Sequence, residues 1–234
     1  MSDWYGFERE DFVWNGFSCV LVKPEKPLPG RPFVWRSEFF GAFASVDLEM
    51  VKRGYYLTYI GLSDQYGCPW AVERMYEYYR HLTGDLGLGP KAIVFGFSRG
   101  GLYTVNFALA HPDCVDRVYL DAPVLDALSW PRGLEKQWNE LLECFGVTEE
   151  TVRACPGARP VMRAREFAAL GIPTAIVAGG ADRTVPYAEN AKIFLNDYIE
   201  AGGRLYVRVK PDCDHHPHSV EDPTPVADFI AAHR

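Results

Sequence analysis

The feature that most constrains the chain is residues 91–101, Lys-Ala-Ile-Val-Phe-Gly-Phe-Ser-Arg-Gly-Gly. An apolar, strand-like run ends in Gly96-Phe97-Ser98-Arg99-Gly100, and a helix is predicted from Arg99 to Ala110. A serine with glycines two residues to either side is typical of a tight strand-to-helix turn that exposes the hydroxyl, because glycine leaves room for the bend. The sequence therefore predicts that Ser98 is a nucleophile, activated by a neighbouring base.

Short apolar segments alternate with helical ones along most of the chain, which predicts the α/β class with a mostly parallel central sheet flanked by helices. Ligands of such sheets bind beyond the carboxyl ends of the strands. The predicted strands are Phe17–Val22, Pro32–Arg36, Tyr55–Ile60, Ala92–Phe97, Val115–Leu120, Pro173–Ala178 and Leu205–Val209. The predicted helices, besides the one after Ser98, are Val46–Arg53, Pro69–Leu82, Tyr187–Ala201 and Pro225–His233.

The length of 234 residues suits one domain, residues 1–234. Residues 126–165 interrupt the strand–helix alternation with Trp130-Pro131, a predicted helix Leu134–Cys144 and a Pro- and Gly-rich exit, Cys155–Pro160. We expect this segment to form a small lid-like insertion over the strand ends.

Charge and composition narrow the classes of partner. The net charge of −7, with no Lys/Arg cluster, argues against nucleic acids and anionic membranes. The first residues lack the pattern of a signal peptide, and no segment approaches the roughly 20 apolar residues that span a bilayer, so a cytoplasmic protein is expected. Six scattered cysteines without a Cys-x-x-Cys pair are expected to be mostly buried thiols.

A serine nucleophile needs a base, and the base needs an orienting acid. Asp182 follows an apolar strand and Gly179-Gly180, which places a carboxylate on a loop at the carboxyl edge of the sheet. Asp121, at the end of another predicted strand, is the alternative acid. The Asp182 position is also compatible with an ordinary turn-forming or capping aspartate.

The base is sought in Asp212–Ser219, directly after the last predicted strand. His215 is the preferred base, with His216 and His218 as alternatives. A zinc site that uses these histidines and Cys213 is a competing hypothesis. Adjacent histidines are expected to point apart and a proline lies between them and His218, so the sequence favours no metal and no cofactor.

The developing oxyanion needs two N–H donors. One is expected from the backbone of Arg99 and the other from Glu38, with Ser37 as the alternative, in the loop after strand Pro32–Arg36. The Arg36 and Glu38 side chains are expected either to form an ion pair or to contact substrate.

The elbow at Ser98, the Asp182 loop and the His215 loop together resemble the α/β-hydrolase superfamily. More narrowly, the chain resembles a bacterial subgroup of hydrolases and esterases, some of them linked to polysaccharide breakdown, in four segments. These segments are Trp35–Gly41, Ser98–Gly101, Leu120–Pro131 and His215–Ser219. The resemblance implies the α/β-hydrolase fold and the order serine, acid, histidine. It departs from the commoner lipase pattern because Arg36-Ser37 stands where lipases often carry His-Gly.

The predicted function is a serine hydrolase that cleaves carboxylic esters through an acyl-enzyme on Ser98. Its substrate is expected to be a small-molecule ester with a short acyl group or an acetylated carbohydrate, since sugars stack on aromatic rings. The alternatives are a peptidase or amidase with the same triad and a noncatalytic binding protein; no oligomeric state is predicted. Candidates for substrate contact are Arg36, Ser37, Trp130, His216 and His218.

Overall fold

A nine-stranded sheet with the order β1-β2-β3-β5-β4-β6-β7-β8-β9 organises the computed structural model, which describes residues 2–232. Strand β4 pairs in parallel with β5 and β6, and the parallel pairing continues through β9, so the predicted mostly parallel sheet is confirmed. The strands are β1 Ser2–Trp4, β2 Phe7–Trp14, β3 Phe17–Lys23, β4 Phe33–Arg36, β5 Tyr56–Ile60, β6 Ala92–Phe97, β7 Val115–Asp121, β8 Thr174–Gly179 and β9 Leu205–Lys210.

The first two strands were not predicted from the sequence. Strands β1, β2 and β3 pair antiparallel with one another, and β3 pairs antiparallel with β5. The turn between β2 and β3 is Asn15-Gly16, and both residues have positive φ (48° and 85°). Asn-Gly with two positive φ values is the two-residue hairpin turn that matches the twist of the flanking strands. This Asn-Gly pair was the available signal for the missed hairpin.

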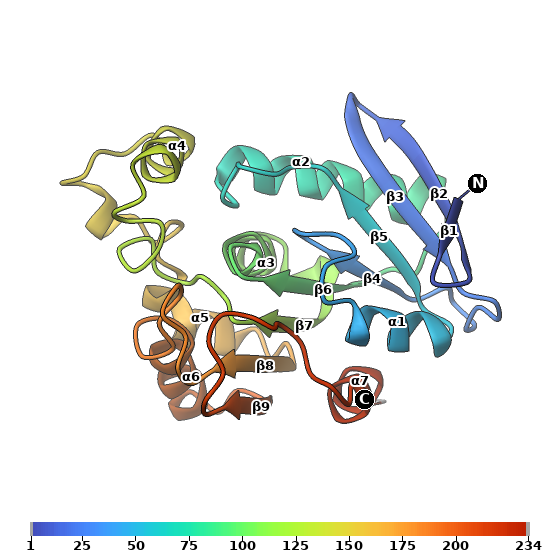
Figure 1. Cartoon of the computed structure of the whole chain (residues 1–234). Helices are drawn as coiled ribbons and strands as arrows, with labels where there is room; N and C mark the ends of the chain where they lie inside the picture. Colours follow the sequence, from blue (N-terminus) through green and yellow to red (C-terminus); the bar gives the residue numbers. More distant parts are fainter. Residues whose placement is uncertain (1, 233–234) are drawn as a thin grey trace.

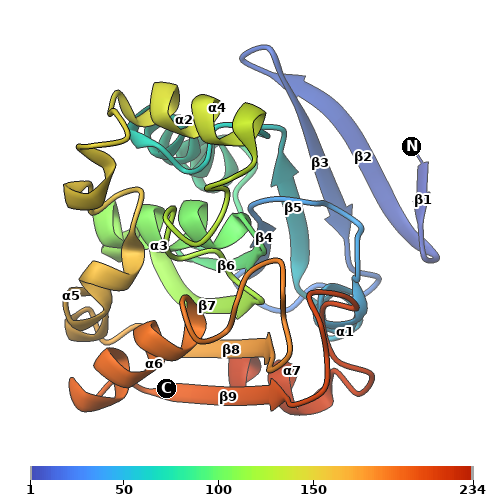
Figure 2. The same ribbon diagram turned by 60° about the vertical axis from the view of Figure 1, so that its left-hand side comes forward.

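Helices cover both faces of the sheet (Figures 1 and 2). Apolar residues of α2, α3, α5 and α6 pack in one core cluster, and those of α1 and α7 pack in a second cluster on the other face. The helices are α1 Ser45–Lys52, α2 Pro69–Arg80, α3 Gly100–Ala110, α4 Glu135–Phe145, α5 Ala164–Ala169, α6 Ala191–Glu200 and α7 Thr224–Ala231. Shorter helical turns lie at His81–Asp85, Pro112–Cys114, Val152–Ala154 and Pro160–Arg163. The predicted end of the last helix, His233, lies outside the described residues.

Residues 126–165 form α4 and irregular turns on the side of the sheet toward which β6 and β8 point (Figure 1). The predicted helix in this segment is present with its bounds shifted by one residue. Buried Trp138 and Leu141 of α4 pack in a third apolar cluster with Tyr66 and Leu102. Hence the segment is anchored to the start of α3 and to the loop before α2. Across residues 2–232, each helix is too short or too polar to cross a bilayer.

The order of the strands decides where a site can form. From β4 the chain runs through α1 to β5 at one side, then returns through α2 to β6 at the other side of β4. The direction of strand addition reverses here, and crevices for ligands form beyond the carboxyl ends of strands at such a point. Arg36 at the end of β4 pairs in register with Phe95 of β6. The loops that follow these two strands, one carrying Ser98 and the other Glu38, therefore lie next to each other.

Candidate active site

Ser98 occupies the tight turn between β6 and α3. Its φ is +48°, in the left-handed region that side chains rarely adopt, and such a conformation costs on the order of 1–3 kcal/mol. Surrounding hydrogen bonds hold it there. Its N–H donates to the Asp121 carbonyl (2.9 Å), and its own carbonyl accepts from the N–H groups of Gly101 (2.9 Å) and Val124 (2.8 Å). The turn thus fixes the direction of the serine hydroxyl.

Gly96 shows why the turn needs glycine two residues before the serine. A Cβ at this position would lie 2.5 Å from the Thr104 hydroxyl and 2.7 Å from the Gly100 carbonyl. Neither can move freely, because one belongs to the interior of α3 and the other to its first turn. The backbone at the end of β6 therefore packs directly against the first turns of α3.

A continuous hydrogen-bonded chain joins Ser98, His215 and Asp182. The serine Oγ lies 3.0 Å from His215 Nε2, and His215 Nδ1 lies 2.7 Å from Asp182 Oδ2. The other carboxylate oxygen of Asp182 accepts the backbone N–H groups of Thr184 (2.9 Å) and Val185 (2.7 Å). All three side chains are buried. With its Nδ1–H donated to Asp182, His215 presents an Nε2 lone pair to the serine hydroxyl.

The loops after β8 and β9 pack closely against each other, which brings Asp182 and His215 into contact. A Cβ on Gly179 would lie 2.5 Å from the carbonyl oxygens of both Cys213 and Asp214, so only glycine fits there. The Asp214 carboxylate accepts the N–H groups of Arg183 (2.9 Å) and His215 (2.8 Å). Hydrogen bonds from the Arg183 backbone and side chain and from the His215 backbone lower the pKa of Asp214 to about 2. This ionised carboxylate ties the two loops to each other.

Asp121, the alternative acid, pairs with a different histidine. Its Oδ1 lies 2.9 Å from His218 Nδ1, and its Oδ2 accepts the Ser219 N–H (2.8 Å) and the Tyr119 hydroxyl (2.5 Å). Both Asp121 and His218 are buried. The site therefore contains two Asp–His pairs, and the one with Asp121 does not reach Ser98.

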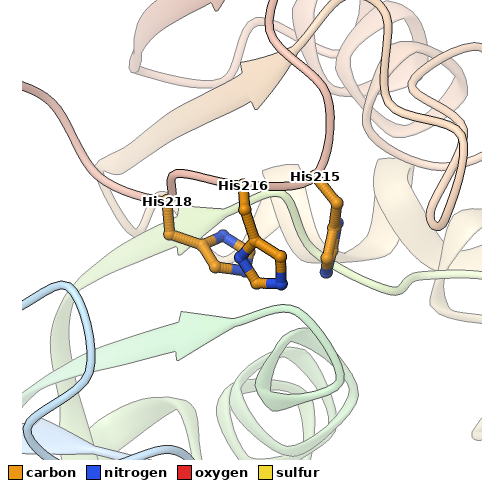
Figure 3. Close-up of side chains that lie close together, drawn as sticks. All are labelled: His215, His216 and His218. Atoms are coloured by element: carbon orange, nitrogen blue, oxygen red, sulfur yellow. The ribbon is translucent and has the colours of Figure 1, made fainter.

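The three histidines of the loop after β9 lie with their rings together (Figure 3). Ring centroids are 5.0 Å apart for His215 and His216, 4.6 Å for His215 and His218, and 4.9 Å for His216 and His218. The expectation that adjacent histidines point apart is wrong. Phe43 explains the arrangement, since His216 stacks on its ring at 5.3 Å and His218 meets it edge-on at 5.2 Å.

Arg36 holds the loop that carries Glu38. Its guanidinium is fully buried and donates to the carbonyl oxygens of Glu38 (3.0 Å), Phe39 (3.4 Å) and Ala42 (2.7 Å). It also forms an ion pair with Asp47 on α1 (2.6 Å). The expected ion pair between the Arg36 and Glu38 side chains is not formed, because buried Asp47 takes the guanidinium. All these donors are directed at protein groups, so Arg36 shapes the loop.

Ser37 is likewise bonded within the protein. Its buried hydroxyl lies within hydrogen-bond distance of the Phe95 carbonyl (2.9 Å), the Gly100 carbonyl (3.2 Å) and the Thr104 hydroxyl (3.1 Å). These contacts join the end of β4 to β6 and α3, the two elements between which the turn at Ser98 lies. We therefore assign the Ser37 side chain to the support of this turn.

The Glu38 side chain pairs with Arg99, the residue after the serine. Arg99 Nε lies 3.1 Å from Glu38 Oε2, and its Nη1 lies 2.5 Å from Asp64. The guanidinium also lies over the rings of Phe39 (5.1 Å) and Tyr66 (5.8 Å). Burial raises the pKa of Glu38, although the charge of Arg99 opposes this shift. Within residues 2–232, the backbone N–H groups of Arg99 and Glu38 donate to no protein acceptor.

A cavity of about 170 Å³ lies in front of Ser98. It is lined by Arg36, Phe39, Ala42, Phe43, Phe97, Ser98, His215, His216 and His218. Trp130 does not line it and instead packs near Tyr66 with a centroid distance of 6.2 Å. A larger hollow of about 850 Å³ borders the cavity at Phe43 and His218 but contains neither the serine nor His215.

Comparison with known proteins identifies the architecture. No protein-family model and no curated protein matches the sequence. Among solved structures, the chain is similar to a putative dipeptidyl aminopeptidase IV from Bacteroides ovatus ATCC 8483, with a TM-score of 0.69 at 15% identity. The likeness covers 96% of this chain and 34% of that protein, so the chain spans about a third of its length.

The chain has the α/β-hydrolase fold. The predicted fold class is therefore confirmed, from the sheet order and from this structural likeness together. In this fold the residues predicted for the triad and the oxyanion hole follow the carboxyl ends of β4, β6, β8 and β9. At 15% identity the likeness concerns the fold and leaves the reaction to be argued from the site itself.

Proposed function

We propose that the protein is a serine hydrolase that cleaves carboxylic esters through an acyl-enzyme on Ser98. The observation that carries this proposal is the buried chain from Ser98 Oγ through His215 to Asp182, with distances of 3.0 and 2.7 Å. A nucleophile, a base within hydrogen-bond reach and an acid that orients the base are the parts that acyl transfer requires.

In the proposed reaction, Ser98 Oγ attacks the ester carbonyl while His215 Nε2 accepts the serine proton. Asp182 stabilises the imidazolium that forms, since its Oδ2 already bonds the other ring nitrogen. The free N–H groups of Arg99 and Glu38 are the proposed donors to the developing oxyanion. His215 then returns the proton to the leaving alcohol, and water hydrolyses the acyl-enzyme with His215 again as the base. These steps need no metal or cofactor.

The cavity favours a short acyl group. Its volume of about 170 Å³ is close to that of an apolar cavity of about 150 Å³ that binds one benzene molecule. Rings of Phe39, Phe43 and Phe97 give it apolar walls, and His216 and His218 add polar edges. Aromatic faces beside hydrogen-bonding groups also suit sugars. We therefore propose short-chain acyl esters, including acetylated carbohydrates, as substrates, with His216 and His218 in contact with them.

Cleavage of peptides by the same triad is the second candidate, because the similar structure from Bacteroides ovatus is named as an aminopeptidase. An aminopeptidase must bind the ammonium group of its substrate, for which a carboxylate is the usual partner. Among the described residues, those that line the cavity carry no carboxylate. The composition of the cavity thus favours ester over aminopeptidase substrates.

A fluorophosphonate probe tests the proposed nucleophile. The wild-type protein should be labelled on the peptide that contains Ser98, and Ser98→Ala should not be labelled. Ser18→Ala, which removes an exposed hydroxyl on β3, is the matched control and should be labelled like the wild type. Failure to label the folded wild-type protein, or equal labelling of Ser98→Ala, would refute the assignment.

A substrate panel tests the proposed class. We expect turnover of p-nitrophenyl acetate and butyrate, a steep fall for longer acyl chains, and release of acetate from acetylated sugars. Dipeptidyl p-nitroanilides should be cleaved far more slowly. A preference for the anilides over the short esters would replace the esterase with the peptidase.

A further inference from the structure

The proposed triad uses only one of the three clustered histidines, His215. His218 has its own carboxylate, Asp121, which in turn is held by two further donors. His216 is exposed, and within residues 2–232 no side chain or backbone group hydrogen-bonds to its ring. A second buried Asp–His pair is not needed for acyl transfer. Its position beside the catalytic histidine calls for a separate explanation.

We propose that His215, His216 and His218 form a binding site for a divalent transition-metal ion such as Zn²⁺, and that the bound ion inhibits the hydrolase. The inhibition rests on the proposed function of His215, whereas the binding does not. The coordinate bond would use the Nε2 lone pair of His215, the same pair that accepts the Ser98 proton. With that pair occupied, the serine keeps its proton and is not activated.

The geometry of the cluster supports a shared ion. One nitrogen from each ring lies within 4.8 Å of the others. Figure 3 shows the three rings extending from the loop after β9 in the same direction, and Ser98 Oγ lies 3.0 Å from His215 Nε2. Ligand nitrogens bind Zn²⁺ at about 2.0–2.1 Å, so the rings must approach one another by about 1–2 Å. His216 can make most of this movement, because it is exposed and its ring, which packs on aromatic neighbours, is held by no hydrogen bond from residues 2–232.

Two of the three histidines, His215 and His218, each bond a carboxylate through Nδ1, as histidines in metal sites do. Histidines that bind metals nearly always donate their other ring N–H to a carboxylate or carbonyl, which fixes the tautomer and strengthens the ligand. Asp182 does this for His215 at 2.7 Å, and Asp121 does it for His218 at 2.9 Å. In both rings Nε2 is consequently the nitrogen that carries no proton and keeps a lone pair, which in His215 faces Ser98 Oγ.

His216 completes the set as the exposed ligand. Its ring centroid lies 5.0 Å from that of His215 and 4.9 Å from that of His218. Imidazole groups select zinc, copper and nickel over magnesium and calcium. Cys213 is not included, because its Sγ faces the carbonyl oxygens of His216 and Pro217 at 3.8 Å. The chemistry therefore indicates a three-imidazole site that is open to solvent through His216.

Zinc titration of tag-free protein tests the site directly. In competition with a chromophoric chelator, the wild type and Ser98→Ala should each bind one Zn²⁺, and His216→Ala and His218→Ala should bind about tenfold more weakly or worse. His81→Ala is the matched control. This histidine lies on another part of the surface, paired with Asp85, and its loss should leave the affinity unchanged.

The inhibition is measured on the wild type with p-nitrophenyl acetate. Zn²⁺ should abolish turnover at the concentration that fills the site, and excess EDTA should restore it. Absence of saturable binding, or equal affinity of His216→Ala, His218→Ala and the wild type, would overturn the site. Zinc bound at this cluster without loss of turnover, or with a gain, would overturn the inhibition. Ser98→Ala separates the two proposals, since it tests binding in a protein that lacks the nucleophile.

Discussion

The two Asp–His pairs of this site offer an internal comparison. Asp182–His215 and Asp121–His218 have similar hydrogen bonds, 2.7 and 2.9 Å, and both are buried. Their rings lie 4.6 Å apart on one loop. They differ in what faces Nε2, the ring nitrogen that does not bond the aspartate. In His215 this nitrogen lies 3.0 Å from Ser98 Oγ. No such hydroxyl bonds to His218 among the described residues.

The difference shows that an Asp–His pair is not by itself a sign of a catalytic base. Asp121 ends β7 and Asp182 follows β8, so both carboxylates reach the same edge of the sheet. The loop after β9 brings one histidine to each of them. Only the position of the serine turn, between β6 and α3, distinguishes the pair with the proposed base, His215, from the other.

The largest expected difference in turnover is between the variants that remove His215 and His218. His215→Ala should lower kcat/KM for p-nitrophenyl acetate by about 10⁴-fold or more, because the serine loses its base. His218→Ala should lower it by less than about tenfold, since that ring does not touch the nucleophile. Steady-state kinetics on both variants measure the contrast. Similar losses in the two variants would remove the distinction between the pairs.

Substitution of Asp182 should lower kcat more than substitution of Asp121, with a smaller difference than between the two histidine variants. Asp182→Asn should reduce kcat by about 10³- to 10⁴-fold, because the amide no longer holds His215 in the required tautomer. Asp121→Asn should change kcat by less than about tenfold, and its main effect should be on stability. Kinetics and thermal unfolding of the two variants separate these outcomes. If Asp121→Asn were the more damaging change to kcat, Asp121 would be the catalytic acid.

The smallest expected effect concerns the support of Asp121. Tyr119→Phe removes one of its donors, and loss of a hydrogen bond to a charged group should cost about 1.5–3 kcal/mol of unfolding free energy. The Ser219 N–H still bonds the same oxygen at 2.8 Å, so turnover should stay within about threefold of the wild type. Urea unfolding and esterase assays on the same preparation check both parts. A catalytic loss with unchanged stability would link the second pair to the reaction.

The sequence predicted the parallel strands and the candidate triad residues because each depends on local pattern. Apolar β-type runs mark β4 to β9, and Ser98, Asp182 and His215 each follow one of these runs. Contacts between residues distant in sequence leave no local pattern from which they could be predicted. Asp47 lies in the first turn of α1, where an acidic residue is common, and only the fold shows that it neutralises Arg36.

The arrangement of the three histidines was also beyond sequence reasoning. It depends on the Phe43 ring, which follows β4 in sequence but lies under His216 and His218 in the fold. The pairing of Asp121 with His218 likewise depends on a contact between residues distant in sequence, so Asp121 stayed open as an alternative acid. Its distance in sequence from His218 concealed that the two side chains pair.

The most direct measurement is to trap the acyl-enzyme. Wild-type protein mixed with p-nitrophenyl acetate, quenched within the first turnovers and digested, should carry an acetyl group on the peptide that contains Ser98. Ser98→Ala should carry none and release p-nitrophenol no faster than the solution background. Turnover by Ser98→Ala at the wild-type rate, or a transient acetyl group on another residue of the wild type, would contradict the proposed mechanism.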